Sequence, residues 1–187
     1  MAKESIYLIH GYAANPEKHW FPWLGEKVKS ELDLSITSLT MPDSLDPKKS
    51  EWDKTCERNI TSTESLTLIG HSLGCITALR FLDQHDINNV NLLLVSGFDE
   101  PVYPLPQLDE FTQQLLNYQK LRAKINQATV ISAQDDDIVP YPYAETLARH
   151  LQSKFVLLPH GKHFIDRDHI TQLPVAYQEL KNLLVSR

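Results

Sequence analysis

Six short apolar segments alternate along the chain with longer segments of helical periodicity, and this alternation restricts the possible folds more than any other feature. The apolar segments lie near residues 5–10, 35–40, 65–70, 90–96, 128–133 and 154–158. Helical spacing is found near residues 20–33, 50–60, 73–85, 110–125, 141–151 and 170–185. Strands and helices that alternate in this way are joined by right-handed crossovers. We therefore predict a compact three-layer α/β fold, with a mostly parallel sheet of about six strands and helices on both faces.

The length and composition are those of one ordinary globular domain. The 187 residues, 42% hydrophobic and 22% charged, predict a single domain over residues 1–187. No segment approaches the roughly 20 apolar residues needed to cross a membrane, and the N-terminus lacks the pattern of a signal peptide. We therefore expect a cytoplasmic protein in which Cys56 and Cys75 stay reduced. The net charge of −6 argues against nucleic acid as a partner.

The most specific motif follows the apolar segment 66–69, where the chain reads Gly70-His71-Ser72-Leu73-Gly74 and then becomes helical. This G-x-S-x-G pattern between a strand and a helix is typical of a nucleophile elbow. The turn is so tight that the positions two before and two after the serine must lack a side chain. The hydroxyl then stands at a helix N-terminus, where developing negative charge is favoured. The motif predicts Ser72 as a nucleophile; the alternative is a serine that only caps the helix.

The helix after this motif carries a second candidate nucleophile, Cys75. This cysteine falls on the same helical face as Leu79 and Leu82, so we interpret it as a small core residue. Arg80 and Asp83 fall outside that face and are expected to reach solvent.

A serine nucleophile needs a base, and the base needs an orienting acid. In the fold that uses this elbow the order along the chain is serine, acid, histidine. The adjacent aspartates Asp135–Asp137 follow one predicted strand, and His160 and His163 follow the next. Chemistry alone leaves all three aspartates and both histidines open. The cluster at 160–169 has no recognised metal-ligand spacing, so we predict no metal site.

The first predicted strand leads into His10-Gly11-Tyr12, which suits the second half of an oxyanion hole. One donor is expected from the backbone N–H of Leu73, directly after the serine. Gly11 permits a close bend, so we predict that the Tyr12 N–H supplies the other donor. The substrate-pocket candidates near these strand ends are His10, Gly11, Trp20, His71, Phe98 and Phe164.

These motifs resemble those of the small serine hydrolases of the YdeN and retinoblastoma-binding-protein-9 family. The resemblance runs nearly end to end, and the aromatic stretch at 19–24 makes it more specific than an elbow alone. It rests on His10-Gly11-Tyr12, Pro16, His19-Trp20-Phe21-Pro22-Trp23-Leu24, Met41-Pro42-Asp43, Gly70-His71-Ser72, Asp135-Asp136, Val139-Pro140, Gly161 and His163-Phe164.

The resemblance implies a compact α/β-hydrolase fold without a large cap domain. It also implies a triad of Ser72, Asp136 and His163, because the family acid stands four residues before a proline, here Pro140. The chain departs from the family in having Asp137 where a proline is frequent. This departure keeps Asp135 and Asp137 as alternatives to Asp136.

These residues together predict a serine hydrolase, and specifically an esterase that works through an acyl-enzyme intermediate without a cofactor. The expected partner is a small-molecule ester; the sequence indicates no membrane and no protein partner. Only the short segment 97–109 could serve as a lid, so we expect small acyl groups. The alternative is a weakly catalytic or non-catalytic protein-binding module on the same fold, although all the parts needed for catalysis follow predicted strands.

Overall fold

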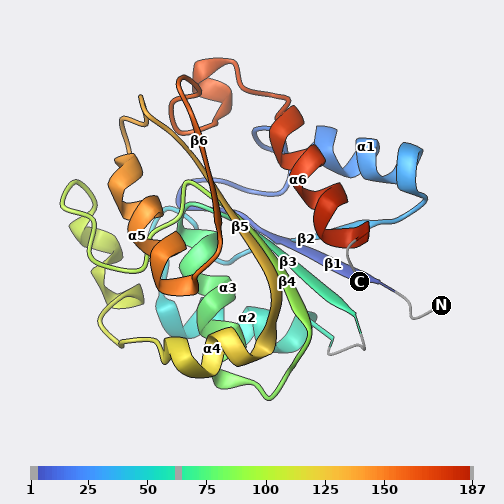
Figure 1. Cartoon of the computed structure of the whole chain (residues 1–187). Helices are drawn as coiled ribbons and strands as arrows, with labels where there is room; N and C mark the ends of the chain where they lie inside the picture. The colour runs from blue at the N-terminus through green and yellow to red at the C-terminus, as the bar shows by residue number, and fades with distance from the viewer. Residues whose placement is uncertain (1–3, 62–64, 186–187) are drawn as a thin grey trace.

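The computed structural model describes residues 4–61 and 65–185 and contains one sheet of six parallel strands (Figure 1). The strand order is β2-β1-β3-β4-β5-β6. The strands are β1 Ser5–Ile9, β2 Ile36–Leu39, β3 Leu66–His71, β4 Val90–Val95, β5 Ile125–Ala133 and β6 Lys154–Leu158. Every predicted strand is present, which confirms the predicted α/β class.

Helices cover both faces of the sheet (Figure 1). On one face lie α1 Phe21–Leu32 and α6 Pro174–Val185, whose apolar residues form one core cluster with one side of the strands. On the other face lie α2 Lys49–Asn59, α3 Leu73–Gln84, α4 Tyr118–Lys124 and α5 Tyr141–Leu151. None of the described helices is long and apolar enough to cross a membrane. The three-layer arrangement is confirmed.

The two central strands, β3 and β4, are completely buried, as their apolar composition predicts for strands covered on both faces. Register aligns Ile9 of β1 with Gly70 of β3, and His71 of β3 with Val95 of β4. The carboxyl ends of these strands therefore lie at the same edge of the sheet. Ligand sites of open parallel sheets are found at this edge.

Two of the predicted helices are shorter than expected. The pattern at 110–125 predicts one helix, but the structure has a 3-10 helix at Pro106–Phe111 and then α4, while β5 already begins at Ile125. Asn117 separates the two helices because its side chain accepts a hydrogen bond from the Lys120 N–H and caps α4. The last helix begins at Pro174 rather than near residue 170, because proline fits the first turn and disfavours helix in the residue before it.

The prediction that Arg80 reaches solvent is wrong. Its side chain is buried, and its guanidinium donates two hydrogen bonds to Asp53 of α2, with Nη2 2.7 Å from Oδ2 and Nε 3.2 Å from Oδ1. Such a paired geometry compensates the loss of hydration of the charge. The ion pair therefore joins α2 to α3, the helix that begins directly after Ser72.

Candidate active site

Ser72 occupies the turn between β3 and α3 with backbone angles φ 53° and ψ −120°. A non-glycine residue rarely adopts this conformation, which costs of the order of 1–3 kcal/mol and is found mainly at functional sites. Its side chain makes no capping hydrogen bond, so the alternative that Ser72 only caps the helix is wrong. The backbone N–H of Ser72 donates to the Val95 carbonyl at 2.9 Å, which fixes the turn onto β4.

The glycines on either side of Ser72 are required by close backbone contacts. A Cβ atom at Gly70 would lie 2.7 Å from Cα of Cys75, and one at Gly74 would lie 2.0 Å from the carbonyl oxygen of Ile9. The beginning of α3 therefore packs directly on the beginning of the loop after β1. The two contacts together explain why the motif needs glycine both before and after the serine.

Gly74→Ala is expected to lower the free energy of unfolding by at least about 2 kcal/mol, because the backbone of β1 cannot move away from the new methyl group. Gly25→Ala is the matched control: Gly25 lies inside α1, and a Cβ there would meet nothing within 4 Å. This control should gain about 0.5–1 kcal/mol. Chemical denaturation measures both values, and similar effects at the two positions would contradict the packing argument.

His163 and Asp136 form a buried pair at the carboxyl ends of β5 and β6. Nδ1 of His163 lies 2.9 Å from Oδ2 and 3.0 Å from Oδ1 of Asp136. Because a carboxylate can only accept, Nδ1 carries the proton and Nε2 is left as the basic nitrogen. Oδ1 of Asp136 also accepts from the backbone N–H groups of Ile138 (3.0 Å) and Val139 (2.9 Å). The carboxylate is therefore held in place from the backbone of its own loop.

Each of the three adjacent aspartates contacts a different residue of the segment that follows β6. Asp135 accepts from the Lys162 backbone N–H at 2.8 Å, and this bond is the main reason that the pKa of Asp135 is lowered. Asp137 binds the exposed Arg167 guanidinium at 2.8 Å. Only Asp136 contacts the imidazole of His163.

The other histidine candidate is turned toward solvent. The side chain of His160 is 86% exposed, and its nearest acidic partner is Asp135 at 3.5 Å. Within residues 4–61 and 65–185, no group of histidine, cysteine and acidic side chains has the arrangement of a metal site.

The loop after β1 approaches the serine closely. A Cβ atom at Gly11 would lie 2.9 Å from Cβ of Ser72. His10 fixes this loop: its Nδ1 lies 2.8 Å from the Gly11 carbonyl oxygen, and its Nε2 accepts from the Met41 N–H at 3.1 Å. The Gly11 carbonyl and the Tyr12 N–H belong to the same trans peptide group and point in opposite directions. Because the carbonyl faces the His10 ring, the Tyr12 N–H points away from that ring. In the described part of the chain, the backbone N–H groups of Tyr12 and Leu73 have no hydrogen-bond partner.

Most of the predicted pocket residues are packing residues. Buried side chains with at most 2% exposure are found at His10, Trp20, His71, Phe98 and Phe164. Trp20 in particular is completely buried, because it belongs to the core formed by α1, α6 and the sheet rather than to an open wall. Cys75 is also completely buried, and its burial raises the thiol pKa, in agreement with a core role.

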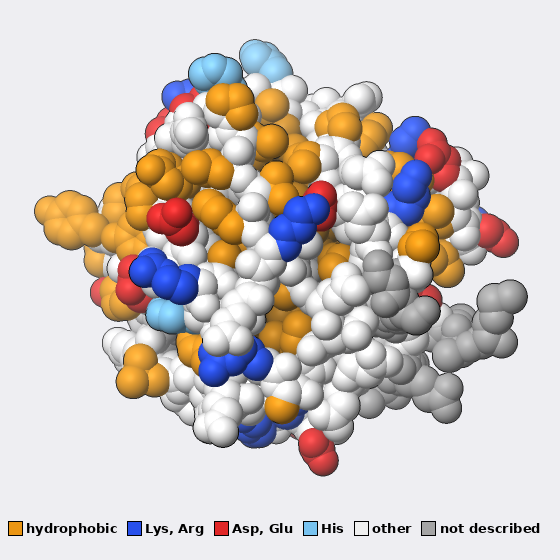
Figure 2. Space-filling model, in the orientation of Figure 1, with side chains coloured by type: hydrophobic (Ala, Val, Ile, Leu, Met, Phe, Trp, Pro, Cys, Tyr) orange, Lys and Arg blue, Asp and Glu red, His pale blue; other side chains and the backbone are white. Residues whose placement is uncertain are grey.

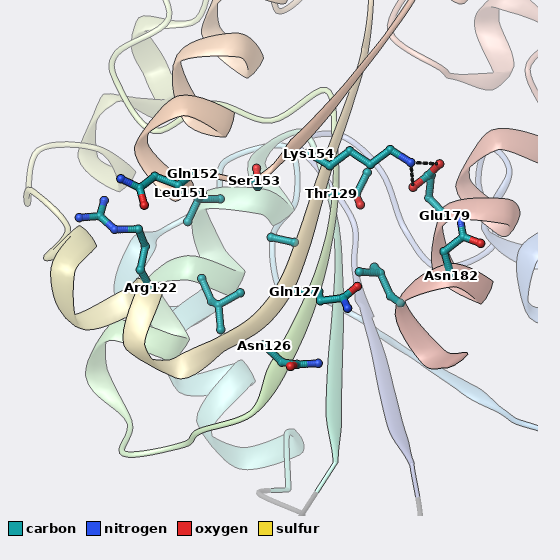
Figure 3. A pocket seen from close by; sticks show the side chains of 13 residues that line it. Arg122, Asn126, Gln127, Thr129, Leu151, Gln152, Ser153, Lys154, Glu179 and Asn182 are labelled. Carbon is teal, nitrogen blue, oxygen red and sulfur yellow. Dashed lines mark hydrogen bonds and ion pairs between the residues drawn. The ribbon is translucent and has the colours of Figure 1, made fainter. Parts of the chain in front are cut away.

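The structure adds contacts that the motifs did not predict. Nδ1 of His19 accepts from the Asp166 backbone N–H at 3.1 Å, which ties the aromatic segment to the loop after β6. A cavity of about 520 Å³ lies at the opposite edge of the sheet, at the beginnings of β5 and β6 (Figure 3). The Lys154–Glu179 ion pair borders this cavity, and none of the predicted site residues does. No sequence pattern indicated either feature.

The order of the parallel strands, with a strained serine turn after a central strand, defines the α/β-hydrolase class. Comparison with known proteins specifies the family: residues 6–182 match the family described as serine hydrolase, and the chain belongs to that family.

Among its relatives, YdeN of Bacillus subtilis (strain 168) is 35% identical over 180 residues, which cover 95% of this chain and 94% of YdeN. Serine hydrolase RBBP9 of Rattus norvegicus is 22% identical over 146 residues, covering 78% of this chain and 77% of RBBP9. The crystal structure of the B. subtilis ydeN gene product superposes with a TM-score of 0.91, 33% identity and coverage of 97% of this chain and 98% of that chain. Est1E of Butyrivibrio proteoclasticus, at 14% identity, shares the fold with a TM-score of 0.71 over 98% of this chain and 90% of its own. The predicted family is confirmed.

Proposed function

We propose that this serine hydrolase is an esterase that cleaves small acyl esters with a triad of Ser72, His163 and Asp136. The observation that carries the proposal is the combination of a strained Ser72, free of any capping bond, with a buried His163–Asp136 pair. Backbone conformations of this sparsely populated kind cluster at active sites, which supports a functional role for Ser72.

In the proposed reaction, Oγ of Ser72 attacks the ester carbonyl while Nε2 of His163 takes the hydroxyl proton. The backbone N–H groups of Tyr12 and Leu73 stabilise the negative charge on the carbonyl oxygen. The intermediate collapses, the bond to the alcohol breaks, and His163 returns the proton to the leaving alkoxide. Water then attacks the acyl-serine by the same route, which releases the acid and restores Ser72. Asp136 keeps the proton of His163 on Nδ1 throughout.

The chemistry requires a nucleophile, a base and positioned hydrogen-bond donors, all of which the chain itself would supply, so the proposal includes no cofactor. The proposed partner is a small molecule. Lys and Arg side chains are scattered on the face seen in Figure 2 and form no extended basic area there, which is consistent with the acidic net charge of −6.

Short-chain esters are expected to be better substrates than long-chain esters. The residues near Ser72 are tightly packed. The segment 97–109 contains the beginning of the 3-10 helix at Pro106–Phe111 and forms no cap domain that could enclose a long acyl chain. Measurement of kcat/KM for 4-nitrophenyl esters of increasing acyl length tests this expectation. A strong preference for long acyl chains would count against it.

The decisive test of the proposed function is titration with a fluorophosphonate, followed by intact mass measurement and peptide mapping. One adduct per chain, located on Ser72, is expected because only an activated serine reacts readily. Absence of any adduct on folded protein would overturn the esterase proposal and turn the search toward a protein-binding role.

A further inference from the structure

His71, the last residue of β3, is completely surrounded at the centre of the candidate site. Its ring contacts four other rings, with distances between ring centres of 5.0 Å to His163, 5.6 Å to His19, 5.6 Å to Phe21 and 5.9 Å to Trp20. Three of these neighbours come from the aromatic segment before and at the start of α1. The packing of the segment therefore converges on one histidine beside the serine.

One nitrogen of His71 makes a hydrogen bond to the backbone of His163. Nε2 lies 2.9 Å from the His163 carbonyl oxygen, and because a carbonyl can only accept, Nε2 carries the proton. The other nitrogen, Nδ1, is buried and has no hydrogen-bond partner among the described residues. A proton on Nδ1 would leave a buried donor unpaired, which is costly. The contacts thus select a single neutral tautomer.

The neighbouring groups also favour the neutral form. Burial lowers the pKa of His71 well below its ordinary value, and the nearby His163 and His19 lower it further. Nε1–H of Trp20, in the ring perpendicular to that of His71, is likewise buried without a partner in the described part of the chain. The Trp20 N–H and Nδ1 of His71 do not bond to each other, so Nδ1 has no donor among the described residues.

We infer that His71 is a positioning residue that fixes His163 for proton transfer through its Nε2–H bond to the His163 carbonyl. This inference rests on the proposed function. Asp136 holds the imidazole of His163 at Nδ1, whereas His71 holds the main chain of the same residue, so the two contacts together fix the ring. The fixing group should carry no charge, because His163 becomes positive when it takes the serine proton. A neutral imidazole donates a hydrogen bond without repelling that charge, whereas a lysine or arginine at this position would repel it.

The test compares two variants with the wild type. His71→Leu removes the donor, whereas His71→Gln keeps an N–H at a similar distance from the backbone. We expect His71→Leu to lower kcat for a short-chain ester by about 100-fold with an unchanged KM, because a displacement of about 1 Å can have this effect. His71→Gln should recover most of the loss. The fluorophosphonate labelling rate should follow kcat, and circular dichroism and thermal unfolding verify that the variants fold.

A measurement on the unmodified protein covers the case in which the variants do not fold. With ¹⁵N-labelled histidine, NMR at neutral pH should show His71 protonated on Nε2 and bare on Nδ1. A proton on Nδ1, or a folded His71→Leu with normal kcat, would overturn the role of His71 while leaving the esterase proposal intact. A wild type that does not react with the fluorophosphonate would overturn the proposed function and, with it, any role of His71 in proton transfer.

Discussion

Ser72→Ala is expected to lower kcat/KM for a short-chain ester by about 10⁵-fold or more and to abolish labelling by a fluorophosphonate. The reason is that Cys75, the other candidate nucleophile on α3, cannot replace the hydroxyl: it is completely buried on the core face of the helix, and its raised pKa keeps it protonated. Residual activity should come only from the oxyanion donors and substrate binding. Stopped assays at high enzyme concentration, with labelling followed by intact mass, provide the measurement.

Ser72→Gly serves as the control that separates chemistry from stability. Glycine also lacks the hydroxyl, so this variant should be as inactive as Ser72→Ala. Unlike alanine, glycine adopts φ 53° without strain, so Ser72→Gly should be about 1 kcal/mol more stable than wild type. Substantial activity in either variant would show that Ser72 is not the nucleophile.

Asp136→Asn is expected to lower kcat by about 10⁴-fold while leaving the fold intact. The asparagine oxygen can still accept from the Ile138 and Val139 N–H groups, so the loop keeps its anchor. The amide NH₂ would face Nδ1 of His163, however, and would force the proton onto Nε2, where it blocks the base. Steady-state kinetics measure the loss, and ¹⁵N NMR of His163 should show the changed tautomer.

The neighbouring aspartates provide matched controls for this prediction. Asp135→Asn weakens one bond to the Lys162 backbone, and Asp137→Asn removes an ion pair in which both side chains are about half exposed. An exposed ion pair contributes only about 0–1 kcal/mol. Neither Asp135 nor Asp137 contacts the imidazole of His163, so both controls should keep kcat within about tenfold of wild type. A loss at Asp135 or Asp137 as large as that at Asp136 would reassign the acid of the triad.

Most of the fold could be predicted because its strands have a local signature. Continuous apolar segments such as Val90–Val95 are typical of strands that are covered on both faces, and short crossovers leave few possible arrangements. The prediction of one helix over 110–125 was wrong because the helical spacing of apolar residues does not show that Asn117 begins a new helix. The prediction that Arg80 reaches solvent was wrong for a different reason. Its partner Asp53 belongs to another helix, and the periodicity of one helix says nothing about contacts with another.

The candidate site likewise has features that the local sequence predicts and features that it does not. The G-x-S-x-G turn is local, so its tightness and its need for glycine followed from the sequence. Chemistry alone left Asp135–Asp137 and the two histidines open, and the family resemblance indicated Asp136 and His163. The contacts themselves depend on the directions in which side chains point, which the folded loops determine. The burial of Trp20 was unpredictable for a similar reason, since an aromatic residue suits a pocket wall and a core equally well.

The all-parallel sheet also has a consequence for the time at which the site forms. Each strand pair joins segments separated by a crossover, and the loops after β1, β3, β5 and β6 meet only when all of these pairings exist. Such non-local contacts form slowly compared with helices. During refolding, helical circular dichroism should therefore recover first and reactivity at Ser72 last. The rate at which Ser72 becomes reactive would then report how fast the native sheet is completed.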